Sequence, residues 1–241
     1  MHNDIAFSLN EKLDPTRLRD EFRRRRRIEI RAFLADGQAE ALRSHLLARG
    51  DWTLVLNAGE KVFEIPRAGF AEMTEEQKAR LDASVAGAAR SGFQYRYETI
   101  RVPDDPDQRD GSGAALDRFV DFMSSGPVVG LMRRITGHSD IEFADGQATS
   151  YSPGHFLTAH DDDVEGKNRR AAYVLGLAPV WRADWGGLLM FHGPDGNIAE
   201  AFTPAMGALR LFAVPAAHSV SFVTPFAPGP RLSVTGWLRA R

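Results

Sequence analysis

The sequence contains no cysteine, which excludes disulfides, zinc-thiolate sites and thiol nucleophiles. It has no apolar run long enough to cross a membrane, and the stretch 1–10 lacks the apolar core of a signal peptide. A net charge of -2 favours neither nucleic acid nor a membrane surface as a partner. We therefore expect a soluble cytoplasmic protein with no membrane partner, and we do not expect nucleic acid binding.

The composition is that of an ordinary globular chain. With 241 residues, of which 43% are hydrophobic, it can bury a sizeable core in one domain spanning 1–241. Five consecutive arginines, Arg23–Arg27, are the exception to the even charge distribution. Because Asp20, Glu21 and Glu29 surround them, we interpret the run as a solvated helix end rather than a nucleic-acid or lipid site.

The first part of the domain, 1–140, is expected to be a helix-rich support with some strands. Periodicity and a capping box at Thr74–Gln77 predict helices at Pro15–Arg26, Gly37–Ala48, from Thr74 to near Gly92, Leu116–Met123 and Val128–Ile135. Alternation predicts strands at Ile28–Arg31 and Phe93–Val102, and the polar stretch Asp104–Gly113 is a candidate mobile loop.

The second part, 141–241, changes to short apolar runs separated by turn residues, such as AAYVLGL, GGLLMF, ALRLFAVP and RLSVTGWL. Short strands at this density without intervening helices predict an antiparallel sandwich or barrel.

An unusual acidic cluster, His160 followed by Asp161–Asp163, lies in this part. It is either a solvated loop or a metal site, because neighbouring carboxylates repel one another unless a cation or water relieves them. A calcium loop fails, since its twelfth position would be Ala172. His160 and Asp162 would share one face of an extended strand.

A transition-metal site needs a further ligand, and His218 in an apolar strand context is the preferred candidate over His155 and His192. Two histidines and one carboxylate form the facial triad of non-heme iron(II) oxygenases. On the last predicted strand, Arg231 shares a face with Thr235 and Trp237, where an arginine could grip a carboxylate. The alternative is an edge strand with its polar face in water.

Taken in order, His160-Asp161-Asp162, Gly186-Gly187-Leu188, His218 and Arg231 resemble the 2-oxoglutarate and Fe(II)-dependent dioxygenases, in particular their prolyl hydroxylase-like branch. The resemblance covers roughly 141–241. It implies a double-stranded β-helix, or jelly roll, flanked by helices, with Fe(II), 2-oxoglutarate and dioxygen as cofactor and cosubstrates, and ascorbate as a candidate reductant.

The resemblance also implies roles for individual residues. The set comprises His160, Asp162 and His218 as iron ligands, Arg231 and Tyr151 as contacts of 2-oxoglutarate, and Thr235 and Trp237 near the iron and the substrate. Relatives often carry a second cosubstrate tyrosine where this chain has Gly176, and Tyr173 is the nearby candidate, although its strand parity is opposite.

The expected substrate is a prolyl residue of a protein or peptide. Demethylases of the superfamily carry a second arginine where this chain has Trp237, an aromatic wall suited to a proline ring. Arg169 and Arg170 could contact a peptide or neutralise the aspartates, and the loop Asp104–Gly113 is a candidate lid. A free amino acid or other small molecule is the second substrate hypothesis, and a non-catalytic jelly-roll binding module is the alternative class.

Overall fold

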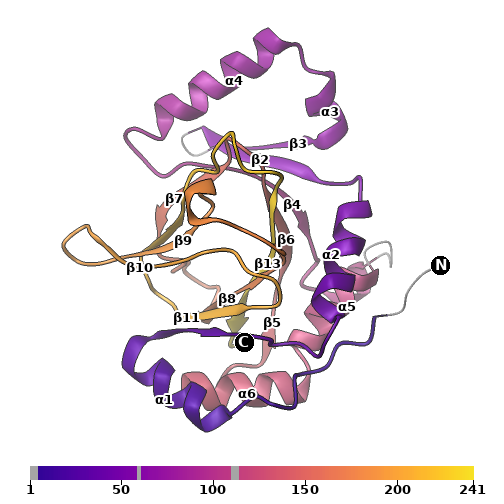
Figure 1. The fold of residues 1–241 in the computed structure, drawn as a ribbon, viewed down its shortest axis with the longest axis vertical. Coiled ribbons are helices and arrows are strands. Elements are labelled where there is room, and N and C mark those ends of the chain that lie inside the picture. Colours follow the sequence, from indigo (N-terminus) through magenta and orange to yellow (C-terminus); the bar gives the residue numbers. More distant parts are fainter. Residues whose placement is uncertain (1–4, 59–60, 110–113) are drawn as a thin grey trace.

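A computed structural model describes residues 5–58, 61–109 and 114–241. One antiparallel sheet curls into a half-barrel, and helices pack against its outer side (Figure 1). In that view α1 (Pro15–Arg25) and α6 (Gly126–Thr136) lie below the sheet, and α2 (Gln38–Ala48) and α5 (Ala114–Met123) lie beside it. At the far end, α3 (Arg67–Glu72) and α4 (Glu75–Ala88) cover an extension of the sheet.

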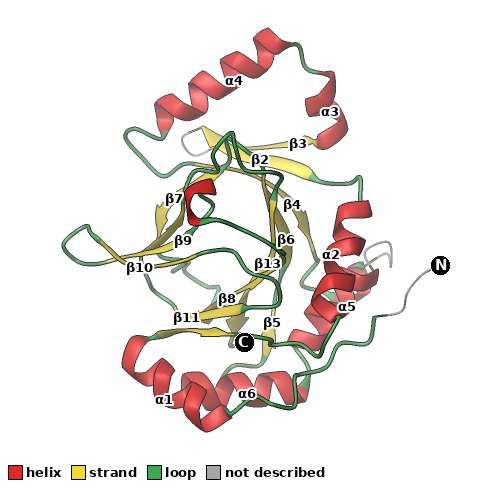
Figure 2. Ribbon diagram, viewed as in Figure 1, coloured by secondary structure: helices red, strands yellow, loops and turns green. Residues whose placement is uncertain are grey.

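Strands occur throughout the chain but concentrate in its second half. Figure 2 shows them forming the curled sheet, with the helices around it. Their bounds are β1 (Arg27–Ile30), β2 (Thr53–Ala58), β3 (Lys61–Pro66), β4 (Tyr95–Arg101), β5 (Phe143–Ala144), β6 (Gln147–Tyr151), β7 (Phe156–His160), β8 (Arg169–Gly176), β9 (Leu189–His192), β10 (Ile198–Phe202), β11 (Leu209–Ala213), β12 (His218–Val220) and β13 (Arg231–Arg239). Two single turns of 3-10 helix are η1 (Pro106–Gln108) and η2 (Ala183–Trp185).

The strand order is β1-β11-β8-β13-β6-β4-β7-β12-β9-β10, with β2 joining β4 and β3 joining β2. The fold therefore brings β7 and β12, far apart in sequence, into direct pairing. The predicted β-rich fold with flanking helices is confirmed. The division into 1–140 and 141–241 stays a prediction.

Strand parity explains which face of the sheet each side chain joins. On β13, Leu232, Val234 and Leu238 point toward the helices and enter the main core. That core also contains Phe22 of α1 and Phe119 of α5. The apolar stripes of the amphipathic helices cover one face of the sheet, which leaves the opposite, concave face to form a cavity.

Most predicted elements in the first part are confirmed within one or two residues, including the capping box at Thr74. The hairpin β2–β3 and the short helix α3 were not predicted. Of the candidate loop, 110–113 lie outside the described residues, and its preceding part contains η1. Among the described helices, none reaches the length and apolarity that a membrane span requires.

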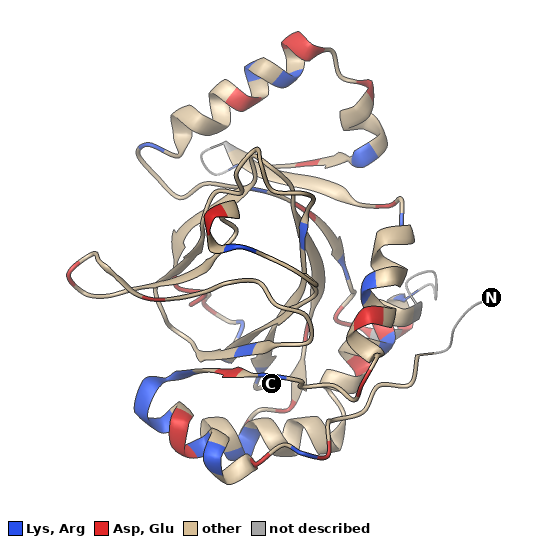
Figure 3. Ribbon diagram, viewed as in Figure 1, with Lys and Arg blue, Asp and Glu red and all other residues tan. Residues whose placement is uncertain are grey.

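The arginine run is only partly a solvated helix end. Figure 3 shows basic residues gathered on α1, where Arg23 and Arg24 are exposed. Beyond them, Arg25 and Arg27 both form ion pairs with Glu200 on β10. Two of the five arginines thus tie the helix end to the sheet.

Candidate metal centre

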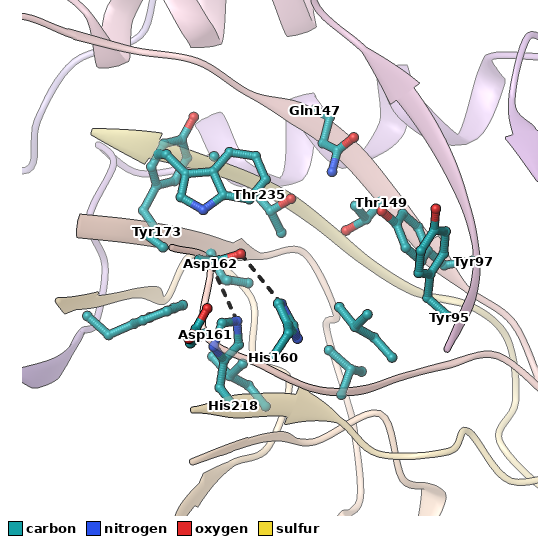
Figure 4. A pocket seen from close by; sticks show the side chains of 18 of the residues that line it. Tyr95, Tyr97, Gln147, Thr149, His160, Asp161, Asp162, Tyr173, His218 and Thr235 are labelled. Carbon is teal, nitrogen blue, oxygen red and sulfur yellow. Dashed lines mark ion pairs between the residues drawn. The ribbon is translucent and has the colours of Figure 1, made fainter. Parts of the chain in front are cut away.

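Three metal-ligand side chains converge on the concave face of the sheet (Figure 4). The register of β7 and β12 places His218 opposite His160. Nε2 of His160 lies 3.5 Å from one carboxylate oxygen of Asp162, and Nε2 of His218 lies 3.5 Å from the other. One ligand atom from each residue falls within 4.8 Å of the others, the only such group in the part of the chain that the structure describes.

Asp162 reaches this group by a different route from the one predicted. Strand β7 ends at His160, and Asp162 has a left-handed backbone with φ of 65°. The expectation that one extended strand carries both residues is therefore wrong. The left-handed turn directs the carboxylate back toward the imidazoles, a conformation that aspartate tolerates better than most residues.

Backbone carbonyls set the tautomer of both histidines. Nδ1 of His160 lies 3.0 Å from the carbonyl oxygen of Thr158, and Nδ1 of His218 lies 2.7 Å from that of Ala216. Because a carbonyl only accepts hydrogen bonds, each Nδ1 must carry the proton. Nε2 of each neutral ring then presents a lone pair toward Asp162, as a metal ligand requires.

The electrostatics of the group suit a divalent cation. Burial lowers the pKa of His218 to about 4, which keeps that imidazole neutral and able to ligate. Burial alone would raise the pKa of Asp162, but the two imidazoles beside the carboxylate outweigh burial, so the net shift is downward. An ionised carboxylate beside two neutral imidazoles fits iron in the pattern of the facial triad.

The group lies in a cavity of about 420 Å³. Its apolar lining includes Leu157, Val174, Leu189, Phe212 and Val220. These side chains come from different strands of the curled sheet, and they limit the access of water to the metal-ligand group.

An aromatic series missed in the sequence also lines this cavity. Phe93, Tyr95 and Tyr97 follow one another with ring centroids 5.5 and 5.7 Å apart, and Tyr97 stacks on Tyr151 at 5.1 Å. The signal was present, because these three residues occupy alternate positions of the predicted strand Phe93–Val102. What the pattern could not reveal is that this face of the strand borders the metal-ligand group.

Arg231 is a buried cation in the lining of the same cavity. It is 4% exposed, and its Nε has no hydrogen-bond partner among the described residues. Burial lowers the pKa of Arg231 to about 10, and its guanidinium carbon lies 5.0 Å from the centre of the Tyr151 ring. A buried cation without an anion is costly, so the site fits a carboxylate ligand.

The strand that carries Arg231 is central, not an edge. β13 pairs with β6 on one side and with β8 on the other. The alternative of an edge strand with its polar face in water is therefore wrong. Gly187 supports the position of the arginine, since a Cβ there would lie 3.1 Å from Cδ of Arg231.

Gly176 occupies the position at which the family resemblance implies a second cosubstrate tyrosine. A Cβ at Gly176 would lie 2.3 Å from the carbonyl oxygen of Ala205, which leaves no room for a side chain. Tyr173 itself lines the cavity, while its ring also packs in the main core and its hydroxyl donates to the Asp145 carbonyl oxygen at 2.8 Å. Its role toward the cosubstrate stays a prediction.

The remaining predicted site residues divide between the cavity and the surface. Tyr151, Thr235, Trp237 and Arg169 line the cavity. The guanidinium of Arg169 lies 3.6 Å from the centre of the Trp237 ring. Arg170 does not join them, since it forms a surface ion pair with Asp140 at 2.8 Å.

The two rival histidines are engaged elsewhere. The ring of His155 accepts from the backbone N–H of Ser152, and Nε2 of His192 lies 2.8 Å from the hydroxyl of Ser219. Neither residue belongs to the metal-ligand group. The preference for His218 agrees with this geometry.

Comparison with known proteins gives a family match over part of the chain, and a fold. Residues 146–239 match the model of the 2OG-Fe(II) oxygenase superfamily. Prolyl 3-hydroxylase OGFOD1 of Xenopus laevis is 39% identical over 89 residues, which cover 34% of this chain and 17% of that protein. The mouse protein of the same name is 36% identical over 88 residues, which cover 34% of this chain and 16% of that protein. The chain thus matches about a sixth of the length of these relatives.

Solved structures resemble the chain along most of its length. A prolyl-4-hydroxylase from Pseudomonas putida superposes with a TM-score of 0.60 at 21% identity, covering 94% of this chain and 99% of that one. A prolyl hydroxylase from Trichoplax adhaerens, solved with a hypoxia inducible factor peptide fragment, gives 0.59 at 15% identity, covering 94% and 89%. At these identities the likeness shows the fold, and the predicted jelly roll is confirmed.

Proposed function

We propose that this chain is a 2-oxoglutarate- and Fe(II)-dependent dioxygenase that hydroxylates a C–H bond. The match of residues 146–239 to the model of the 2OG-Fe(II) oxygenase superfamily supports the proposal. The observation that carries the proposal is the pairing of two sites in one cavity. His160, Asp162 and His218 offer two imidazoles and one carboxylate, and Arg231 offers a buried cation with no ion pair among the described residues.

Each group in the cavity has a defined task in this proposal. His160, Asp162 and His218 would hold Fe(II) through two Nε2 atoms and a carboxylate oxygen. Bound there with 2-oxoglutarate, the iron would supply the oxidation of a C–H bond by dioxygen. Arg231 would bind the distal carboxylate of 2-oxoglutarate by charge-assisted hydrogen bonds, and Tyr151 would border it.

The rest of the lining prepares the site for a substrate. Buried apolar side chains such as Val174 and Phe212 exclude water from the reacting centre. Thr235 lies on the same strand face as Arg231 and Trp237, and we assign it a place near the metal. The loop Asp104–Gly113 stays a candidate lid.

For the substrate, we propose a prolyl residue in a protein or peptide. Trp237 and the Tyr95–Tyr97 pair offer flat faces to a pyrrolidine ring. The names of the relatives, prolyl 3-hydroxylase and prolyl-4-hydroxylase, support this choice. A free amino acid or other small molecule is the second candidate. Ascorbate as reductant and a cytoplasmic location stay predictions from the sequence.

Succinate formation tests the reaction class. Fe(II)-loaded protein is given 2-oxoglutarate, oxygen and ascorbate, beside Asp162→Ala and Arg231→Ala variants. Glu165→Ala is the matched control, since this exposed acidic neighbour is neither in the metal-ligand group nor in the cavity lining. Turnover lost in the two site variants and kept in the control supports the proposal. If the protein shows no turnover, and calorimetry detects no 2-oxoglutarate binding, the dioxygenase proposal gives way to the non-catalytic binding module.

The substrate class needs a separate comparison. Proline-containing peptides, matched peptides with alanine in place of proline, and free proline are each incubated with the active protein. Mass spectrometry then detects a gain of one oxygen atom. Hydroxylation of the peptide alone favours the prolyl hypothesis, and hydroxylation of free proline alone favours the small-molecule hypothesis.

A further inference from the structure

The backbone conformation of Asp162 is unusual among the proposed metal ligands. His160 and His218 belong to paired strands, whereas Asp162 lies outside any strand and has a left-handed backbone. Only a few per cent of non-glycine residues adopt this conformation, and it persists when surrounding contacts hold it. The position of its carboxylate therefore depends on what fixes the segment between β7 and β8.

Arg169 makes that contact. Its Nη1 donates to the backbone carbonyl oxygen of Asp162 at 3.0 Å, and the same nitrogen lies 3.9 Å from a carboxylate oxygen of Asp162. Arg169 is the first residue of β8, so this bond ties the segment after β7 to a paired strand. One guanidinium thus restrains both the backbone and the side chain of the carboxylate ligand.

The guanidinium of Arg169 is itself held in place by Trp237, which has further contacts of its own. It lies 3.6 Å from the centre of the Trp237 ring, within the range of a close cation–π contact. The backbone N–H of Trp237 donates to the Asp145 carboxylate at 2.8 Å, and Arg239 lies 3.1 Å from that carboxylate. A connected series of polar and aromatic contacts therefore leads from the sheet to Asp162.

From this geometry we infer that Arg169 is a positioning residue for the Asp162 carboxylate, with Trp237 as its stacking support. The inference rests on the proposed metal role of Asp162. It differs from the role expected from the sequence, in which Arg169 touches the substrate.

The direction in which metal affinity changes separates a positioning role from a substrate-contact role for Arg169. Simple Coulomb repulsion predicts that removing a guanidinium near the metal would tighten cation binding. Loss of positioning predicts the opposite, since changes in residues that orient metal ligands weaken affinity by about 10- to 100-fold. We therefore expect Arg169→Ala to raise the Kd for Mn(II) by about 10-fold or more.

The experiment titrates the 241-residue chain with Mn(II) and measures the free ion by electron paramagnetic resonance. Arg170→Ala is the matched control, because this neighbouring arginine pairs with Asp140 at the surface. Trp237→Phe, which keeps a ring for stacking, should stay closer to wild type than Trp237→Ala. Arg169→Lys keeps the charge and one donor, and should recover part of the affinity.

Each outcome decides the inference. Unchanged or tighter Mn(II) binding by Arg169→Ala, with a raised KM for a peptide, would overturn it in favour of substrate contact. Equal weakening by Arg169→Ala and Arg170→Ala would also overturn it. If Arg169→Ala does not fold, Arg169→Lys and Trp237→Ala carry the same comparison. Failure of the wild-type protein to bind Mn(II) would instead remove the proposed function, and the inference with it.

Discussion

Replacing Arg231 by methionine tests the buried cation directly. The arginine is 4% exposed, and its Nε lacks a partner among the described residues. Methionine fills a similar volume without a charge. We expect Arg231→Met to lose binding of 2-oxoglutarate while the ligand-free protein keeps, or gains, stability, because an uncompensated buried charge has been removed.

The magnitude follows from the burial of the guanidinium. Burial lowers the pKa of Arg231 to about 10, which corresponds to a cost of about 3 kcal/mol for the charged form. A carboxylate that pairs with the guanidinium offsets this cost. Loss of one partner from a buried charge pair costs about 2–5 kcal/mol. The Kd for 2-oxoglutarate should therefore rise by about 30-fold or more.

Calorimetry and thermal unfolding measure the two effects. Calorimetry of Mn(II)-loaded protein gives the Kd for 2-oxoglutarate. At a ligand concentration of about 100 times its Kd, the wild-type protein should gain about 2.7 kcal/mol of stability, and Arg231→Met should gain almost none. Denaturant unfolding without ligand compares the stabilities of the two proteins.

Arg210→Met is the control for loss of a buried arginine. Arg210 is also almost fully buried, but it pairs with Glu29 at 2.8 Å. Its removal leaves that carboxylate without its partner and should destabilise the protein. The reasoning is refuted if Arg231→Met binds 2-oxoglutarate like wild type, or if it loses as much ligand-free stability as Arg210→Met.

Three further outcomes follow from the structure. Burial lowers the pKa of His155 from 6.5 to about 4, so the unfolded chain takes up a proton at a higher pH than the folded protein does. Denaturant titrations should therefore show the free energy of unfolding falling by up to about 3 kcal/mol between pH 6.5 and pH 4. The fall should be smaller in His155→Gln. Gly176→Ala should lower the free energy of unfolding by about 1–3 kcal/mol in the same titrations, because the added Cβ would clash with a backbone oxygen. A Cβ added at Gly229 would have no atom within 4 Å, so Gly229→Ala should be nearly neutral. Tyr95→Ala should raise the KM for a proline peptide without changing the Kd for 2-oxoglutarate, and an unchanged KM would remove Tyr95 from the substrate wall.

Local sequence patterns were enough to predict the fold class and several site residues of this protein. The change from helical to strand periodicity predicted a β-rich fold with flanking helices, because amphipathic spacing reflects which face of an element is buried. Parity along the last strand correctly placed Arg231, Thr235 and Trp237 on one face. The absence of cysteine narrowed the further metal ligand to a histidine.

Contacts between distant segments required the tertiary structure. The pairing of His218 with His160 depends on the register of β7 and β12, which no local pattern encodes. The left-handed turn at Asp162 replaced the expected strand, and the roles of Arg169 and Arg170 diverged because one meets Trp237 and the other meets Asp140. Periodicity determines the face on which a side chain lies, but the curl of the sheet decides what that face surrounds.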